Sequence, residues 1–292
     1  MAQGRLRSIV RRLKDRIALN RRAFILYSIL RVLVLLTLIR CIMTQRWEGV
    51  AISILVLVLF LVPSILEDKA RIEIPGLFQA IIYTFIFAAE ILGEIDHYYV
   101  LIPGWDTVLH TLNGFLCAAI GFSLVDLLNR SSKNISLSPV YVTLVAFCFS
   151  MTIGVLWEFV EFGFDTFLGM DMQKDTFVTS ISSVALDPTN EGNRVQIHDI
   201  VTTAITTAAG DTTTINGYLD IGLIDTMKDL LVNFVGALAF SVVGYQHLKR
   251  NESGNWAEGL HVRPVPTEQY QENERRLDEM EAERAEKKRQ RE

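Results

Sequence analysis

The stretch WDTVLHTLNGFLCAAIGFSLVDLL, residues 105–128, joins a long apolar run to a few polar side chains near its beginning. A helix of about 20 apolar residues crosses the hydrocarbon core of a bilayer, so this stretch predicts a membrane-spanning helix. Further apolar runs predict the same structure at 23–43, 50–66, 75–92, 138–168 and 223–246. Because 50% of the chain is hydrophobic and much of it lies in these runs, the sequence predicts an all-α polytopic membrane protein of about six transmembrane helices.

The basic residues predict how the chain is oriented. Residues 1–22 are rich in Arg, and pairs of basic residues follow the second, fourth and sixth spans: Lys69 with Arg71, Arg130 with Lys133, and Lys249 with Arg250. Since loops rich in Lys and Arg stay in the cytosol, we expect both termini to be cytosolic and the protein to lie in the cytoplasmic membrane. Residues 1–22 form either a basic amphipathic segment on the inner surface or a plain charge block. Residues 249–292 form a charged cytosolic tail.

A Thr-rich and Asp-rich segment, residues 169–222, separates the fifth span from the sixth. Apolar and polar residues alternate in RVQIHDIVTTAI, from Arg194, and in TTTINGYL, from Thr212. Alternation with a period of two predicts strands, so we expect a small β-rich extracytoplasmic insertion; a disordered acidic loop is the alternative. The expected organisation is the segment 1–22, transmembrane helices in 23–168, the insertion 169–222, a sixth transmembrane helix in 223–248 and the tail 249–292.

Polar residues recur at helical spacing in each of the last three predicted spans. Residues three or four positions apart lie on one face of a helix, so each set forms a polar stripe. The stripes are Asp106, His110 and Asn113 in the fourth span, Glu158, Glu161 and Asp165 in the fifth, and Asp225, Asp229 and Asn233 in the sixth.

The predicted topology brings the three stripes to the same membrane leaflet. The fourth and sixth spans begin at the outer side and the fifth ends there, so the stripes also match in depth. Rim positions are Asp106, Asp165 and Asp225, and the positions about two turns deeper are Asn113, Glu158 and Asn233. Acidic side chains at that depth are unfavourable against lipid, so we expect the stripes to face one polar pocket that opens outward.

The chemistry of these side chains predicts a metal site. Carboxylates around one pocket repel one another, which requires protons or a cation among them. Oxygen ligands with one imidazole suit Mg²⁺, Mn²⁺ or Zn²⁺. The expected ligands are Asp106, His110, Asp165, Asp225 and Asp229, and the expected general base is Glu158 or Glu161. Asn113 and Asn233 either complete the polar cluster or join the helices through hydrogen bonds.

In WDTVLHTLNGF, LWEFVEFGFD, GMDMQ and GLIDTMKDLLVNFVGA the sequence resembles the YjdF-type family of bacterial and archaeal membrane proteins, a family of unassigned function. The likeness covers about residues 25–246. A more distant similarity, to VanZ-like proteins, implies a link with the cell envelope and no established reaction. The Thr-rich insertion departs from the shorter family pattern. The residues that carry the resemblance are Asp106, His110, Glu158, Glu161, Asp225, Asp229 and Asn233.

The pattern favours a metal-dependent hydrolase or transferase acting on a lipid or lipid-linked envelope substrate at the outer leaflet. One alternative is a proton- or cation-coupled transporter, and another is a non-catalytic membrane scaffold. A transporter needs a polar path through the membrane, whereas we expect no ionisable residue in the inner halves of the last three spans before their cytosolic flanks. We expect membrane lipids and no nucleic acid as partners; the sequence indicates no oligomeric state.

Overall fold

The structure is a computed structural model that describes residues 21–70, 72–131, 136–250 and 262–264, with separate positions at 272, 275, 279 and 282. Residues 1–20 of the predicted amphipathic segment and most of the predicted tail lie outside the described residues. The chain forms two compact units: one is Thr152–Val232, and the other contains the described residues before and after it.

Within the described part of the chain, six helical spans are long and apolar enough to cross a membrane. This confirms the predicted all-α polytopic fold, and each span falls within a few residues of its prediction. The spans are Phe24–Met43, Trp47–Glu67, Gly76–Ile95, Trp105–Asn129, Pro139–Leu168 and Leu223–Lys249.

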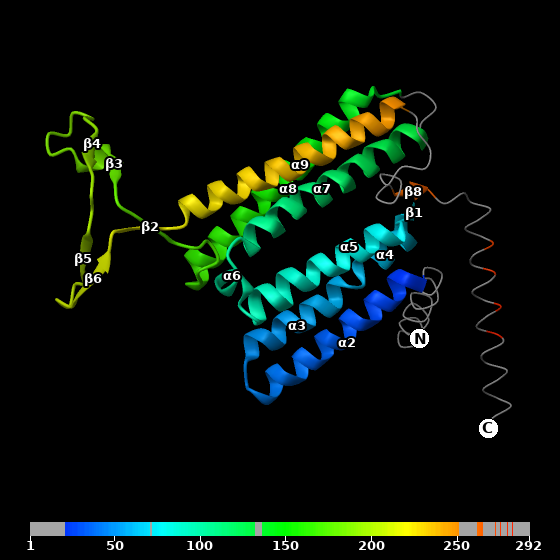
Figure 1. Cartoon of the computed structure of the whole chain (residues 1–292), viewed down its shortest axis with the longest axis horizontal. Helices are drawn as coiled ribbons and strands as arrows, with labels where there is room; N and C mark the ends of the chain where they lie inside the picture. The colour runs from blue at the N-terminus through cyan, green and yellow to red at the C-terminus, as the bar shows by residue number, and fades with distance from the viewer. Residues whose placement is uncertain are drawn as a thin grey trace. The chain divides into compact units, whose positions relative to one another are not determined.

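The first three spans form one helical layer. They consist of α2 (Arg21–Met43), α3 (Trp47–Leu59) with α4 (Val62–Ala70), and α5 (Gly76–Ile86), which continues as the π-helix η1 (Phe87–Ile95). Figure 1 shows α2, α3 and α5 side by side. The layer is joined by the rings of Tyr27, Phe60 and Tyr83, whose centroids lie 5.1–5.8 Å apart. Tilted and edge-on contacts of this kind add to the stabilisation from burying the rings.

The second span is divided where its sequence changes. Between α3 and α4 the helix tightens, because Leu61 donates its N–H to the carbonyl of Val58. Pro63 follows as the second residue of α4, where its missing N–H leaves little unsatisfied. The proline is therefore accommodated at a helix start inside the span.

The last three spans are α7 (Trp105–Ser131), α8 (Pro139–Leu168) and α9 (Leu223–Arg250). Glycines allow α7 and α9 to touch backbone to backbone, and the two helices run side by side in Figure 1. A Cβ added at Gly114 would lie 2.1 Å from the carbonyl oxygen of Asn233, and one at Gly236 would lie 2.0 Å from that of Thr111. Small residues at helix crossings are typical of membrane bundles.

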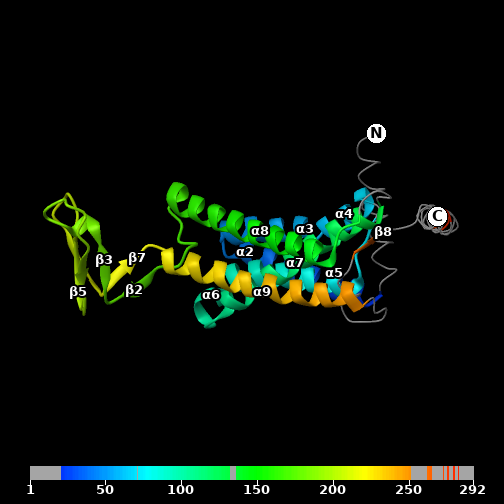
Figure 2. The same ribbon diagram turned by 90° about the horizontal axis from the view of Figure 1, so that it is seen from above.

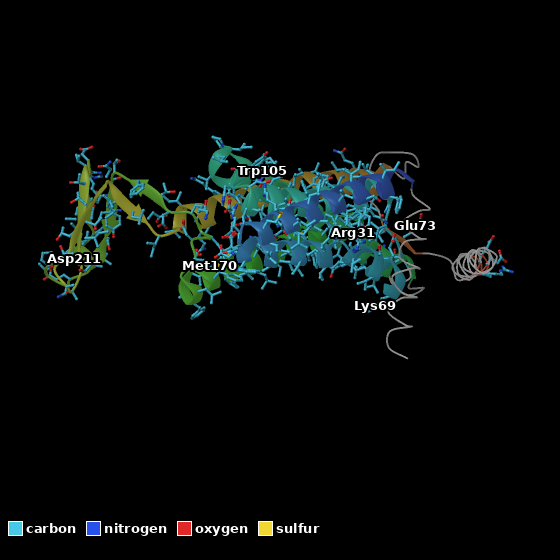
Figure 3. The ribbon with its side chains drawn as sticks, turned by 90° about the horizontal axis from the view of Figure 1, so that it is seen from below. Arg31, Lys69, Glu73, Trp105, Met170 and Asp211 are labelled. Carbon is cyan, nitrogen blue, oxygen red and sulfur yellow. The ribbon has the colours of Figure 1, made fainter. Side chains whose placement is uncertain are left out.

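One end of the bundle is closed by a returning segment of the chain. Strand β1 (Ile72–Glu73) follows α4 and pairs antiparallel with β8 (Arg263–Pro264). The preceding Val262 is buried in an apolar cluster with Phe78, Phe122 and Phe240, and its N–H donates to the hydroxyl of Ser123 at 3.3 Å. Figure 3 shows Lys69 and Glu73 at this end, far from Trp105.

The segment between α8 and α9 consists of short antiparallel hairpins, which confirms the predicted β-rich insertion. Strand β2 (Thr176–Val178) pairs with β7 (Tyr218–Asp220), β3 (Ile181–Ser183) with β4 (Val195–Ile197), and β5 (Thr202–Thr206) with β6 (Thr212–Asn216). A 3₁₀ turn, η2 (Val184–Leu186), follows β3. Figure 2 shows β2 and β7 together at the base of the insertion. The low-complexity stretch TTAITTAAGDTTT forms the β5–β6 hairpin.

A tight turn closes the β5–β6 hairpin. Thr206 pairs with Thr212, and Gly210 has a φ of +91° in the loop between them. That conformation is open to glycine and strained for other residues. Within the same loop, Thr207 donates its N–H to the carbonyl of Asp211.

Candidate functional site

The centre of the candidate site is a group of three buried carboxylates in the unit Thr152–Val232. Glu158 and Glu161 come from α8 and Asp229 comes from α9; their exposed fractions are 5%, 8% and 3%. One oxygen from each can be chosen so that all lie within 4.8 Å of one another. The i, i+3 spacing turns both glutamates to one side of α8, as predicted. The structure thus brings together both predicted catalytic glutamates and one predicted metal ligand.

Glu161 is held by its neighbour one turn earlier on α8. The indole Nε1 of Trp157 donates to Oε1 of Glu161 at 2.8 Å. The Trp157 side chain is 39% exposed, whereas Glu161 is buried. The sequence analysis did not single out Trp157, although the i, i+4 spacing in WEFVE could have indicated the contact.

The other unit contains an amide-centred junction between α7, α8 and α9. Asn113 donates its side-chain N–H to Oδ1 of Asn233 at 3.3 Å, and Asn233 contacts the sulfur of Met151 at 3.7 Å. The hydroxyl of Ser150 donates to the carbonyl of Gly114 at 2.7 Å. Both asparagines therefore join helices, one of the two roles predicted for them. Ser150 and the glycines of the α7–α9 crossing were missed, because their role depends on contacts between helices.

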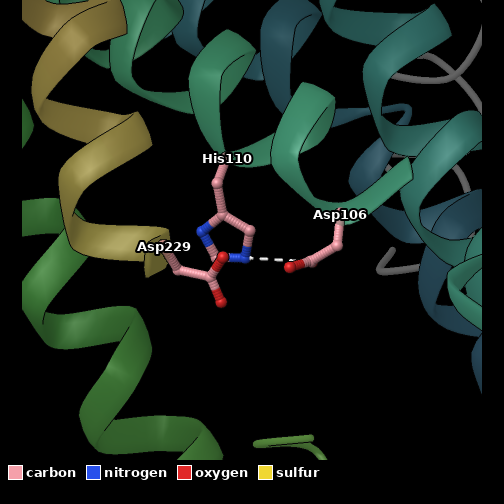
Figure 4. Close-up of side chains that lie close together, drawn as sticks. All are labelled: Asp106, His110 and Asp229. Atoms are coloured by element: carbon pink, nitrogen blue, oxygen red, sulfur yellow. Dashed lines mark ion pairs between the residues drawn. The ribbon is translucent and has the colours of Figure 1, made fainter. Parts of the chain in front are cut away.

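Asp106 and His110 form a pair on the first turns of α7, in the same unit as Asn113. Nε2 of His110 lies 3.4 Å from Oδ1 of Asp106 (Figure 4). Their i, i+4 spacing predicted a shared face, and this contact confirms it. The two side chains form an ion pair when the imidazole is protonated.

The two remaining predicted ligands support the start of the insertion. Both oxygens of Asp165 accept backbone N–H groups, from Met172 at 2.6 Å and from Gln173 at 2.8 Å. Asp225 accepts the N–H of Lys174 at 2.7 Å. The end of α8 and the beginning of α9 are thus joined through the turn 172–174. Among the described residues, neither aspartate belongs to a group with three ligand atoms within 4.8 Å of one another.

Other aspartates surround this turn. The pKa of Asp175 is raised above its ordinary value, first by desolvation and then by the negative charges of Asp171, Asp220 and Asp165. The base of the insertion is therefore an acidic surface. Asp175 itself lies outside the helical spans.

The expectation that the inner halves of the last three spans lack ionisable residues is wrong for Asp126. Asp126 lies within the fourth span, near the end of α7 opposite Asp106, and is 2% exposed. A buried acid at that depth requires polar neighbours, and three positions earlier Ser123 accepts the N–H of Val262. The sequence alone did not indicate burial there, because Asp126 is close to the basic residues that mark the end of the span.

Comparison with known proteins places the chain in a family. It is 29% identical over 106 residues to an "Uncharacterized protein" of Thermotoga maritima; the alignment covers 36% of this chain and 53%, about half, of that relative. No solved structure matches the chain. Residues 25–250, which run from within α2 to the end of α9, match the family described as "Predicted membrane protein (DUF2238)". The chain therefore belongs to this family of membrane proteins.

Proposed function

We propose that the protein is a divalent-metal-dependent membrane enzyme, a hydrolase or transferase, in which Glu158, Glu161 and Asp229 hold the ion. The observation that carries the proposal is the gathering of three carboxylates, each less than a tenth exposed, with ligand oxygens within 4.8 Å of one another. Three such groups repel one another when ionised, and a bound cation removes that repulsion. Ionised side chains inside a membrane span are also costly unless they are neutralised.

The donor set favours a hard cation. Three carboxylates suit Mg²⁺ or Mn²⁺, and an added imidazole would favour Zn²⁺. A divalent ion supplies Lewis acidity toward a phosphate or ester oxygen and activates water. A carboxylate oxygen of Glu158 or Glu161 that does not itself hold the ion would then accept a proton as general base.

We further propose that His110 and Asp106 contribute to the same site. Asn113 lies about one turn beyond His110 on α7, and Asn233 lies about one turn beyond Asp229 on α9. The support for this proposal is the spacing of the polar stripes, which matches His110 and Asp229 in depth and places Asp106 on the same face of α7 as His110. Asp165 and Asp225 support the site indirectly, by fixing the ends of α8 and α9.

The substrate class follows from the surroundings of the carboxylates. Phe159 and Phe162, which are interleaved with the glutamates on α8, have exposed side chains, as expected for a helix that faces lipid. We propose a lipid or lipid-linked envelope substrate that reaches the site from the outer leaflet of the cytoplasmic membrane. The resemblance to YjdF-type and VanZ-like proteins supports the envelope.

The test is metal binding by the purified full-length protein. We expect close to one divalent ion per chain by elemental analysis and Mn²⁺ titration, and at least a tenfold loss of affinity in Glu158→Gln and in Asp229→Asn. Asp211→Asn, in an exposed hairpin turn, is the matched control and should bind as the unmodified protein does. A folded protein that binds neither Mg²⁺, Mn²⁺ nor Zn²⁺ would rule the proposal out.

One observation favours the alternative of a proton- or cation-coupled transporter. Buried Asp126 lies near the end of α7 that is opposite Asp106 and gives that end an ionisable group. Against it, α7 carries the buried apolar side chains Leu116, Ala119 and Phe122 between Asn113 and Asp126. Flux of protons or cations into proteoliposomes that is lost in Asp126→Asn would favour transport over catalysis. A non-catalytic scaffold would instead keep its cellular function after Glu158→Gln.

A further inference from the structure

We propose that Trp157 is the positioning residue for Glu161 and that its indole reports whether the metal site is occupied. The inference rests on the proposed function, because it concerns the same carboxylates. It adds a residue that neither the motif pattern nor the family match assigns. Trp157 acts through Glu161 and is not proposed to touch the ion or the substrate.

The geometry that carries the inference is a hydrogen bond within one turn of α8. Nε1 of Trp157 lies 2.8 Å from Oε1 of Glu161, a normal length for an N–H donor to a carboxylate. Glu161 is 8% exposed and shares the buried group with Glu158 and Asp229, whereas Trp157 is 39% exposed. The indole thus extends from the exposed surface of α8 to the buried carboxylates.

A glutamate side chain has three rotatable bonds, so its carboxylate direction is set by what it contacts. The rigid indole fixes one oxygen of Glu161 and thereby limits the orientations open to the other. Carboxylates that ligate metals are commonly fixed by such neighbouring donors, whose loss lowers metal affinity about 10-fold to 100-fold. Because the indole has no hydrogen-bond acceptor, it cannot itself serve as a ligand.

The bond also serves the tryptophan, since an indole N–H in hydrocarbon needs an acceptor. If the bond has only this structural role, Trp157→Phe changes the stability of the protein and leaves its metal affinity unchanged. The positioning role predicts in addition that ion binding alters the surroundings of the indole. The two roles are separated by measuring affinity and an indole signal on the same protein.

The experiment uses full-length protein labelled with 5-fluorotryptophan, which keeps the indole N–H. The chain has 4 tryptophans, so fluorine NMR gives a small set of resonances, each assigned by a Trp→Phe variant. We expect Mg²⁺ to shift the Trp157 resonance and to leave that of Trp47 unchanged. In Trp157→Phe we expect Mn²⁺ affinity to fall about 10-fold to 100-fold. The matched control Trp47→Phe, at the exposed first residue of α3, should retain full affinity.

The outcomes separate this inference from the proposed function. If Trp157→Phe and the unmodified protein bind Mn²⁺ with the same affinity, the positioning role is wrong and the metal site stands. The same conclusion follows if Mg²⁺ does not shift the Trp157 resonance. If the unmodified protein binds no divalent ion, both fail. Should Trp157→Phe not fold, the Trp157 resonance is assigned by elimination from the other three variants and its response to Mg²⁺ decides.

Discussion

Asn113 donates its side-chain N–H to the side-chain oxygen of Asn233 across the contact between α7 and α9. The two amides occupy the closest part of this helix crossing, since Gly114 faces the carbonyl of Asn233 directly. A hydrogen bond between asparagines inside a membrane bundle contributes on the order of 1 kcal/mol. Its main effect is therefore to fix the register of α7 against α9, and it adds little to the stability of their contact. The backbone contact at the glycines is the larger constraint, because no side chain can be inserted there without moving a helix.

Gly236→Ala is expected to destabilise the bundle. The added methyl group would lie 2.0 Å from the carbonyl oxygen of Thr111, and a backbone oxygen cannot rotate away as a side chain can. Overpacking at such a contact costs about 3 kcal/mol. The measurement is the thermal unfolding midpoint of the purified protein in detergent.

Gly163→Ala is the control for that substitution. Gly163 also lies in a long apolar helix, α8, but nothing lies within 4 Å of a Cβ added there. Alanine favours helix over glycine by up to about 1 kcal/mol, so this variant should unfold at the same temperature or higher. Equal midpoints for the two variants would contradict the close α7–α9 crossing.

His110→Ala is expected to change which ion the protein prefers. Removing the imidazole leaves carboxylate oxygens, which suit Mg²⁺ and Mn²⁺ better than Zn²⁺. We expect Zn²⁺ affinity to fall at least tenfold and Mn²⁺ affinity to fall by less. Competition between the two ions, followed by the electron paramagnetic resonance of Mn²⁺, gives the ratio of the two affinities directly. An unchanged ratio would remove His110 and its partner Asp106 from the proposed site.

The periodicity of apolar and polar residues was sufficient to predict those parts of the fold that depend on a single helix. All six spans, the shared face of Glu158 with Glu161, and that of Asp106 with His110 follow from local spacing. The strands of the insertion also follow from local alternation. These features need no knowledge of which helices are neighbours.

Contacts between distant segments were not predictable in the same way. In the sequence, nothing distinguishes Gly114 from other small residues, because its role depends on the contact with Asn233. Val262 lies in a polar stretch whose apolar residues follow no regular period. The carboxylates of Asp165 and Asp225 looked like ligands because spacing shows a shared face but not the hydrogen bonds that each side chain makes. Whether either also binds an ion stays a prediction.

The loop after η2 should lose protection in acid. The carboxylate of Asp187 accepts bonds from the hydroxyl and N–H of Thr189 and from the N–H of Asn193, which lower its pKa from 3.8 to about 2. A lowered pKa means that the ionised form stabilises the folded loop. The contribution is complete above about pH 4 and is lost as the pH falls toward about 2.

Hydrogen exchange of a peptide covering 187–193 measures this effect. After correction for intrinsic rates, we expect exchange to accelerate as the pH is lowered from about 4 toward 2. Asp187→Asn should exchange faster already at neutral pH, while Asp211→Asn in the neighbouring hairpin should not affect the loop. Identical protection in Asp187→Asn and the unmodified protein would contradict the role of the carboxylate.

Thiol labelling tests the predicted orientation in the membrane. In a Cys148→Ala background, which removes the exposed native cysteine, Asp211→Cys should react with a membrane-impermeant maleimide added to intact cells. Glu73→Cys, in the strand beside β8, should react only after the cells are permeabilised. The reverse result would place the insertion and the proposed site on the cytosolic side.

The pairing of β2 with β7 brings together the two ends of the insertion between α8 and α9. Thr176 faces Asp220, so the outgoing and returning chains stand about 5 Å apart where they pair. Evolution could therefore lengthen, exchange or delete everything between those strands without moving the ends of α8 and α9. Because Glu158, Glu161 and Asp229 lie on α8 and α9 themselves, such changes would leave the three carboxylates in place.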